Sequence, residues 1–198
     1  MKTKLWTLVL SAMLMSAGFA TAQQKPGEVR RIVTGLDSAG KAIVMFDSKV
    51  ALASFRSPNG AAEMWVTDKS PPDFSWTDDR AKIKVGLIPP KGGTIFRVVD
   101  FVPTSAKIDA MDINTMMKVV GDHAPSKGLP PRHPMMHRTR SVDYAIIISG
   151  EIDMLLDDGE VHLKAGDVVV QQATNHAWVN RGKEICRIAF ILMDSQDP

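Results

Sequence analysis

Short apolar segments alternate with turn residues over the last third of the chain. Residues 141–149 read SVDYAIIIS, residues 168–172 read VVVQQ, and residues 187–193 read RIAFILM. Between the first two segments, the Asp158-Gly159 pair is typical of a tight hairpin turn. Short apolar segments bounded by turn residues favour strands over helices. Because the first segment is apolar at successive positions, we expect that strand to be buried on both faces.

The preceding part of the chain shows the same pattern, with one exception. A hairpin is predicted over residues 28–46, and further short strands are predicted at residues 50–55, 62–67 and 94–102. The exception is residues 109–120, where apolar side chains at helical spacing predict one short helix. Many short strands with frequent turns and a single helix indicate an all-β barrel or sandwich.

The first 22 residues have the pattern of a secretory signal peptide. Lys2 and Lys4 precede an apolar run, and Ala20-Thr21-Ala22 fits a small-x-small cleavage site. The run is too short and too weakly flanked for a spanning helix, and an uncleaved N-terminal anchor is the alternative. We therefore expect an exported protein, periplasmic or secreted, that does not cross the membrane.

Three parts are predicted after the signal peptide. Residues 23–120 would form an N-terminal β extension whose short helix packs on the barrel, residues 121–134 a linker, and residues 135–198 the barrel core. The single cysteine, Cys186, lies in an apolar segment and is predicted to be a buried, inert thiol. Removal of the signal peptide would bring the formal charge of +2 close to zero, which gives no basic surface for nucleic acid or membranes.

Candidate metal ligands gather late in the chain. His137 and Asp143 are six residues apart, so both side chains point to one face if the intervening chain is extended. His176, Trp178 and Asn180 likewise share one face of their segment. Imidazole and carboxylate ligands suit divalent transition metals, and two histidines with one acid suit non-haem iron.

Other interpretations of these residues stay open. Asp143 can pair with Arg138 or Arg140, which would leave the histidines as ordinary turn residues. His133 stands at the edge of the candidate site and is either a further ligand or a solvated loop residue. His162 alternates with charged residues, so we expect it on a solvent-exposed face.

Residues 166–180, which read GDVVVQQATNHAWVN, resemble the second sequence motif of the cupin family. Gly166, Asp167, His176 and Asn180 match residues of that motif, whereas Gln172 and Thr174 replace its usual proline and glycine. This motif is the more specific part of the resemblance.

The first cupin motif is matched less well. Gly150 fits the closing glycine of that motif, which puts Asp143 where the family usually has glutamate. The usual histidine pair, separated by one residue, is replaced by a stretched pair formed by His133 and His137. The resemblance covers roughly residues 135–193.

The resemblance implies an all-β fold, a double-stranded β-helix or jelly-roll barrel. It also implies a divalent metal, iron, manganese, nickel or zinc, held by His137, Asp143 and His176, with His133 or water as a further ligand. Cupins often dimerise through N-terminal strands, so the resemblance implies a possible homodimer.

Two functions follow from the resemblance and the candidate site. The first is a metal-dependent enzyme, of dioxygenase, decarboxylase or isomerase type, that acts on a small organic molecule. Tyr144, Trp178 and Arg138 are its candidate substrate-binding residues. The second is a non-catalytic, degenerate cupin that binds a small ligand in its barrel, which the departures in the first motif favour.

Overall fold

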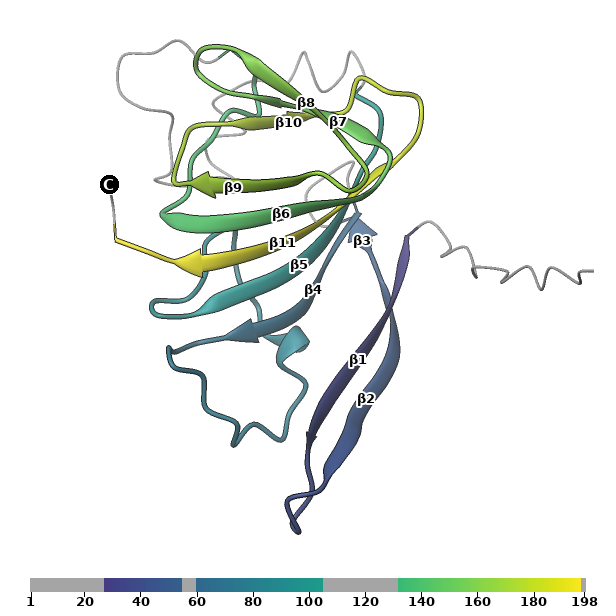
Figure 1. Ribbon diagram of the computed structural model, residues 1–198, viewed down its shortest axis with the longest axis vertical. Coiled ribbons are helices and arrows are strands. Elements are labelled where there is room, and N and C mark those ends of the chain that lie inside the picture. Colours follow the sequence, from purple (N-terminus) through teal and green to yellow (C-terminus); the bar gives the residue numbers. More distant parts are fainter. Residues whose placement is uncertain (1–26, 55–59, 105–131, 197–198) are drawn as a thin grey trace, which may run out of the picture.

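The computed structural model describes residues 27–54, 60–104 and 132–196 (Figure 1). The predicted signal peptide (residues 1–22) and the predicted helix (residues 109–120) lie outside these ranges, as does most of the predicted linker. Within the described ranges, no helix has the length and apolar character needed to cross a membrane.

Antiparallel strands make up nearly all of the regular structure in the described part of the chain. In chain order the elements are β1 (Glu28–Leu36), β2 (Ala42–Ala51), β3 (Ala53–Ser54), β4 (Gly60–Thr67), the 3-10 helix η1 (Arg80–Lys82), β5 (Thr94–Phe101), β6 (Ser141–Ser149), β7 (Glu151–Leu155), β8 (Glu160–Lys164), β9 (Val168–Gln172), β10 (Ala177–Val179) and β11 (Cys186–Asp194). The strands predicted in the last third of the chain are all present.

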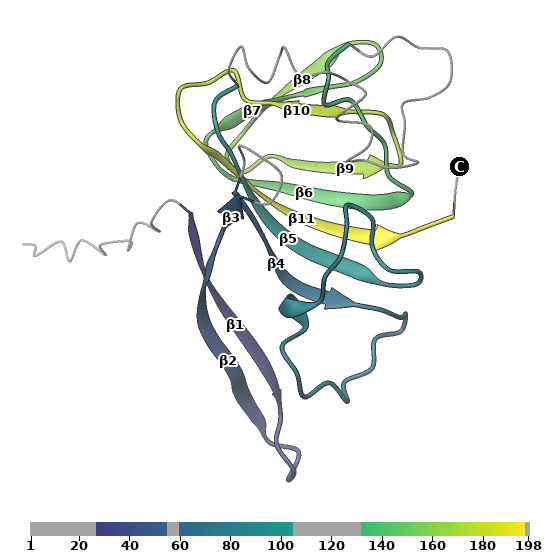
Figure 2. The same ribbon diagram turned by 180° about the vertical axis from the view of Figure 1, so that it is seen from behind.

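The strands form two sheets that close on one core, and a separate ribbon. The larger sheet has the order β3-β4-β5-β11-β6-β9, the smaller has the order β10-β7-β8, and β1 pairs with β2 alone. The ribbon projects from one end of the barrel in both views (Figure 1, Figure 2). This arrangement confirms the predicted all-β, jelly-roll fold.

The larger sheet takes strands from both sides of the predicted linker. β4 and β5 precede the linker, yet β5 pairs directly with β11 along its whole length. The barrel sheet therefore includes β4 and β5 and is not confined to residues 135–198, where we predicted the core. Local sequence patterns do not show this because the pairing joins segments about ninety residues apart.

The core lies between the two sheets. It includes Ile95 of β5, Ile147 of β6, Ile188 of β11 and Ile152 of β7, each at most 1% exposed. Burying an isoleucine side chain contributes roughly 1.5–3 kcal/mol, so these four stabilise the closed barrel substantially. Cys186 is also fully buried, and burial raises the pKa of its thiol to about 12, which agrees with the predicted inert cysteine.

The strand β6 is buried on one face only. Asp143, Ala145 and Ile147 point into the barrel, whereas Ile146 is 38% and Ile148 is 48% exposed. The prediction that this strand is buried on both faces was therefore wrong. An apolar run does not show whether the second face is covered, and an antiparallel sheet can leave one face to solvent.

The turns follow from a few local residues. The Asp37 side chain accepts hydrogen bonds from the backbone N–H groups of Ala39 and Lys41, which closes the predicted β1–β2 hairpin. Gly150 has a φ of +76°, and a Cβ there would lie 2.6 Å from the Ile185 carbonyl oxygen. Only glycine fits where β6 leaves the larger sheet for β7.

Candidate functional site

The two predicted histidine ligands meet at the entry to β10. The backbone N–H of His137 donates to the His176 carbonyl at 2.9 Å, and the reverse hydrogen bond measures 2.8 Å. Their imidazole rings are therefore held side by side, with centroids 4.6 Å apart. Residues 39 positions apart in the sequence are brought together by this single bridge.

Backbone carbonyl groups fix the tautomer of both imidazoles. His137 Nδ1 lies 2.8 Å from the Met135 carbonyl oxygen, and His176 Nδ1 lies 3.0 Å from the Thr174 carbonyl oxygen. Because a carbonyl oxygen only accepts, each Nδ1 must carry the proton, and Nε2 is the unprotonated nitrogen of the neutral ring. Histidines that bind metals have this arrangement, with the second nitrogen donating to a carbonyl or carboxylate.

His176 is kept neutral by its surroundings. It is 3% exposed, and burial lowers its pKa from 6.5 to about 3, with repulsion from His137 adding to the effect. The hydrogen bond to the Thr174 carbonyl opposes this shift. The ring therefore stays neutral at neutral pH, with Nε2 unprotonated. This is the state that a metal ion requires of a histidine ligand.

Asp143 is a buried carboxyl group on the inner face of β6. It is 6% exposed, and its Oδ1 atom is buried without a hydrogen-bond partner. Burial raises its pKa from 3.8 to about 6, and a hydrogen bond with Ser141 and the charge of Arg97 partly oppose this. The alternative pairing with Arg140 is wrong, because Arg140 pairs with Asp194 at 3.0 Å.

The predicted set of three ligands is only partly assembled. Among residues 27–54, 60–104 and 132–196, no group of three or more His, Cys, Asp and Glu side chains is placed to hold a metal ion. His137 and His176 are adjacent, but Asp143 does not complete a three-ligand group with them. The structure therefore provides a histidine pair and a separate buried carboxyl group.

His133 differs from the other two histidines. Its Nδ1 atom accepts a hydrogen bond from the Met135 N–H at 3.1 Å, so the neutral ring carries its proton on Nε2. This tautomer is the opposite of the one fixed in His137 and His176. The predicted role of His133 as a further ligand has no support from this geometry.

The three candidate substrate-binding residues have different positions. The Trp178 ring lies 5.9 Å from the His176 ring and packs against the core. Tyr144 lies on β6 between Asp143 and Ala145, so its side chain points to the outer face, away from the interior that holds Asp143. Arg138 is half-buried and next to His137 in the sequence.

Several polar residues of the interior were not predicted. Arg97 and Glu63 form a buried ion pair on the inner face, with a shortest distance of 2.6 Å, and Arg97 also donates to the Gly86 carbonyl. Gln171 is 3% exposed on β9. Alternation along β5 places Arg97 on the same face as apolar core residues, which is a signal that could have identified it.

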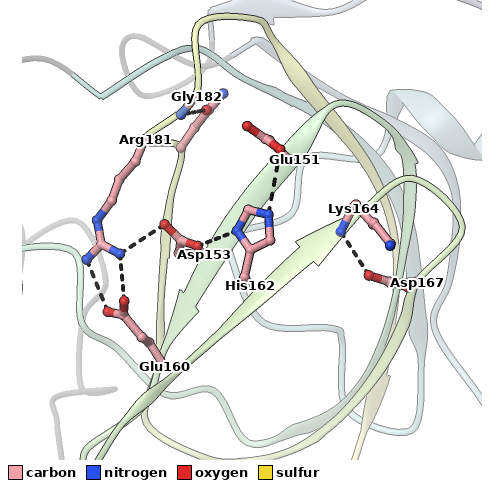
Figure 3. Close-up of polar contacts among 9 residues, drawn as sticks. Glu151, Asp153, Glu160, His162, Lys164, Asp167, Arg181 and Gly182 are labelled. Carbon is pink, nitrogen blue, oxygen red and sulfur yellow. Dashed lines mark hydrogen bonds and ion pairs between the residues drawn. The ribbon is translucent and has the colours of Figure 1, made fainter.

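His162 belongs to a separate network on the outer face of the smaller sheet (Figure 3). Its Nδ1 lies 2.8 Å from Asp153 and its Nε2 lies 3.6 Å from Glu151, and Arg181 links Asp153 to Glu160. The hydrogen bond with Asp153 raises the pKa of His162. Its side chain is 60% exposed, which confirms the predicted solvent-facing position.

The fold and the interior define a β-barrel protein of the jelly-roll class with a buried histidine pair. Residues 124–192 match the family model described as a cupin domain. This part of the chain therefore carries a cupin domain, as the motif at residues 166–180 indicated.

Known proteins similar to this chain include cupin-domain proteins of fungi. A stretch of 69 residues is 45% identical to the Phomopsin biosynthesis cluster protein C′ of Diaporthe leptostromiformis, covering 34% of this chain and 36% of that protein. The chain thus matches little more than a third of that relative. Over 178 residues it is 28% identical to the cupin-domain-containing oxidoreductase srdD of Neurospora crassa, covering 86% of this chain and 77% of that protein.

A solved structure with similarity to the chain is the Cupin 2 conserved barrel domain protein from Salinispora arenicola. It has a TM-score of 0.36 and 13% sequence identity, over 69% of this chain and 76% of that one. The fold assignment rests on the strand order and the family match rather than on this likeness.

Proposed function

We propose that this cupin is a metal-dependent enzyme that acts on a small organic molecule. The observation that carries the proposal is the pair of adjacent imidazoles, His137 and His176, each with its Nδ1 proton directed at a backbone carbonyl. Two rings fixed in this way, of which burial keeps His176 neutral, suit a divalent transition metal such as iron, manganese, nickel or zinc. The relative described as an oxidoreductase supports redox chemistry among the reaction types that cupins carry out.

Asp143 is the proposed third ligand. Its buried Oδ1 atom has no hydrogen-bond partner, so a cation would reduce the cost of keeping the carboxylate ionised inside the barrel. A bound metal would supply Lewis-acid polarisation of the substrate or activation of oxygen. The chain itself fixes both rings through the Met135 and Thr174 carbonyls and excludes water from His176.

Replacing His176 with glutamine should strongly weaken metal binding. Wild-type protein purified without a histidine tag and reconstituted with Zn²⁺ or Fe²⁺ should hold about one equivalent, because the proposed ligands, two imidazoles and a carboxylate, would serve a single ion. The His176→Gln variant should bind at least about 100-fold more weakly, since loss of a direct ligand costs more than loss of a group that only orients one. Elemental analysis and titration calorimetry measure both quantities.

His162→Gln is the matched control for this experiment. His162 is exposed and stands near Glu151 and Asp153, so it could bind added metal at the surface. Its replacement should leave the stoichiometry unchanged. Less than about a tenth of an equivalent of metal in reconstituted wild-type protein would contradict the proposal.

A second candidate function is a ligand-binding cupin without catalysis. The observation that favours it is that no three-ligand group is assembled in the described part of the chain. Under this alternative, a small ligand binds equally well with and without a chelator, and His176→Gln leaves its affinity unchanged. Under the enzyme proposal, chelation removes turnover.

A further inference from the structure

Gln171 presents a hydrogen-bond acceptor to the barrel interior. Its Nε2 atom donates to the Thr174 carbonyl at 2.9 Å, which fixes the orientation of the amide because a carbonyl oxygen only accepts. Its Oε1 atom is buried and has no hydrogen-bond partner. A buried acceptor without a donor is unfavourable, so this atom favours a ligand that brings one.

A second acceptor lies directly beside the first. Gln171 on β9 is the register partner of Asp143 on β6, and the Asp143 Oδ1 atom is also buried without a partner. Side chains that face each other across an antiparallel pair have Cβ atoms about 4.5–5.5 Å apart. Two acceptors on neighbouring strands therefore share one region of the interior.

Aromatic rings border this region. Phe190 on β11 is the register partner of Ala145, which places it diagonally across from Asp143 on the same inner face. The Trp178 ring packs edge-on against Phe190, with centroids 5.5 Å apart, and remains half-buried. Stacked and edge-on aromatic contacts favour a flat apolar ring as a further neighbour.

The charged groups of the interior argue against an organic acid. The Arg97 guanidinium is already paired with Glu63 and the Gly86 carbonyl, so it is satisfied within the protein. A ligand carboxylate near Gln171 would face the acceptor oxygens of Gln171 and Asp143 rather than donors. A neutral ligand with a hydroxyl group matches these acceptors instead.

We propose that the barrel interior binds a phenol-type ligand, with its ring against Trp178 and Phe190 and its hydroxyl group donating to Gln171 Oε1. This inference rests on the proposed function in one respect, namely that the interior receives a small organic molecule. Gln171 thereby becomes a specificity residue that selects ligands with a hydroxyl donor. It acts on the ligand and not on the metal.

Three fluorinated probes test the selection: 4-fluorophenol, 4-fluoroanisole and 4-fluorobenzoate, followed by fluorine NMR. Wild-type protein should bind the phenol about tenfold more tightly than the anisole, because the anisole leaves the Gln171 acceptor unpaired. The benzoate should bind more weakly than the phenol. In Gln171→Met, the preference for phenol over anisole should fall to within about twofold, while anisole binding is retained.

Two further variants separate ring contacts from hydroxyl contacts. Gln172→Met makes the same substitution on the exposed face of β9 and should leave the preference intact. Trp178→Leu should weaken the phenol and the anisole together, leaving their ratio unchanged. Equal binding of phenol and anisole by wild-type protein, or an unchanged ratio in Gln171→Met, overturns the proposal.

Binding measurements with and without metal distinguish this inference from the proposed function. The preference for phenol should persist in chelator-treated protein. A preference that appears only after Zn²⁺ is added would show that the ligand hydroxyl binds the metal rather than Gln171. That result would overturn the role of Gln171 and leave the proposed metal site intact. If Gln171→Met does not fold, the NMR resonances of the Gln171 side-chain amide in wild-type protein provide the test. They should shift when 4-fluorophenol is added and not when 4-fluoroanisole is added. Identical shifts with both probes overturn the proposal.

Discussion

Replacing Asp100 with asparagine should lower the free energy of unfolding by about 3–5 kcal/mol. Asp100 accepts from Arg187 Nε at 2.6 Å and from Nη2 at 2.7 Å, and both side chains are at most 8% exposed. Removing one charge from such a pair leaves the other buried and uncompensated, which costs more than the pair itself contributes. Urea denaturation followed by circular dichroism measures the change.

Asp47→Asn is the control for this prediction. Asp47 also binds an arginine through two hydrogen bonds, but its partner Arg30 is 62% exposed and Asp47 is 47% exposed. An exposed ion pair contributes about 0–1 kcal/mol, so this replacement should change stability little. Similar losses from both replacements would contradict the assignment of a buried, desolvated pair at Asp100.

The same ion pair also ties the projecting ribbon to the barrel. Asp100 accepts the backbone N–H of Gly27, and Arg187 donates to the Glu28 carbonyl at the start of β1. A two-stranded ribbon is marginally stable alone, so it depends on such anchors. Asp100→Asn should therefore also increase hydrogen exchange in β1 and β2 more than in β7 and β8.

Asp143→Asn and His176→Gln should change the pH dependence of stability in opposite directions when metal is absent. The folded pKa of Asp143 is raised from 3.8 to about 6. Its contribution to folding stability is therefore complete below pH 3.8 and is lost as the pH rises to about 6. The folded pKa of His176 is lowered from 6.5 to about 3, so its contribution is present above pH 6.5 and is lost as the pH falls toward 3.

The two effects nearly cancel in the wild type between about pH 4 and pH 6. They have opposite signs, and each changes the free energy of unfolding by about 1.4 kcal/mol per pH unit. When the pH rises from about 4 to 6, the free energy of unfolding of Asp143→Asn should increase by about 2 kcal/mol relative to the wild type. That of His176→Gln should decrease by about 2 kcal/mol. Urea titrations with a chelator at several pH values measure these differences. Profiles that run parallel to the wild type would show that neither group titrates as its burial requires.

Much of the fold could be predicted from the sequence because the relevant signals are local. Short β-rich segments and turn residues located the β1–β2 hairpin and the strands around Asp158-Gly159. Residues 166–180 indicated the cupin domain before any contact was known. Period-two alternation also requires Asp143 to share one face of its strand with Ala145 and Ile147, and all three are buried in the structure.

Only the tertiary structure decided which faces are covered and which side chains meet. Alternation assigns residues to two faces but does not show which face lies inside, so the buried Arg97 was missed. The pairing of His137 with His176 depends on a bridge between distant segments, and their tautomers depend on backbone carbonyls at that bridge. The sequence by itself determined the strands and the chemical types of the candidate ligands. Long-range pairing determined their burial, their protonation and the unpaired acceptor on Gln171, because these properties depend on neighbours that are remote along the chain.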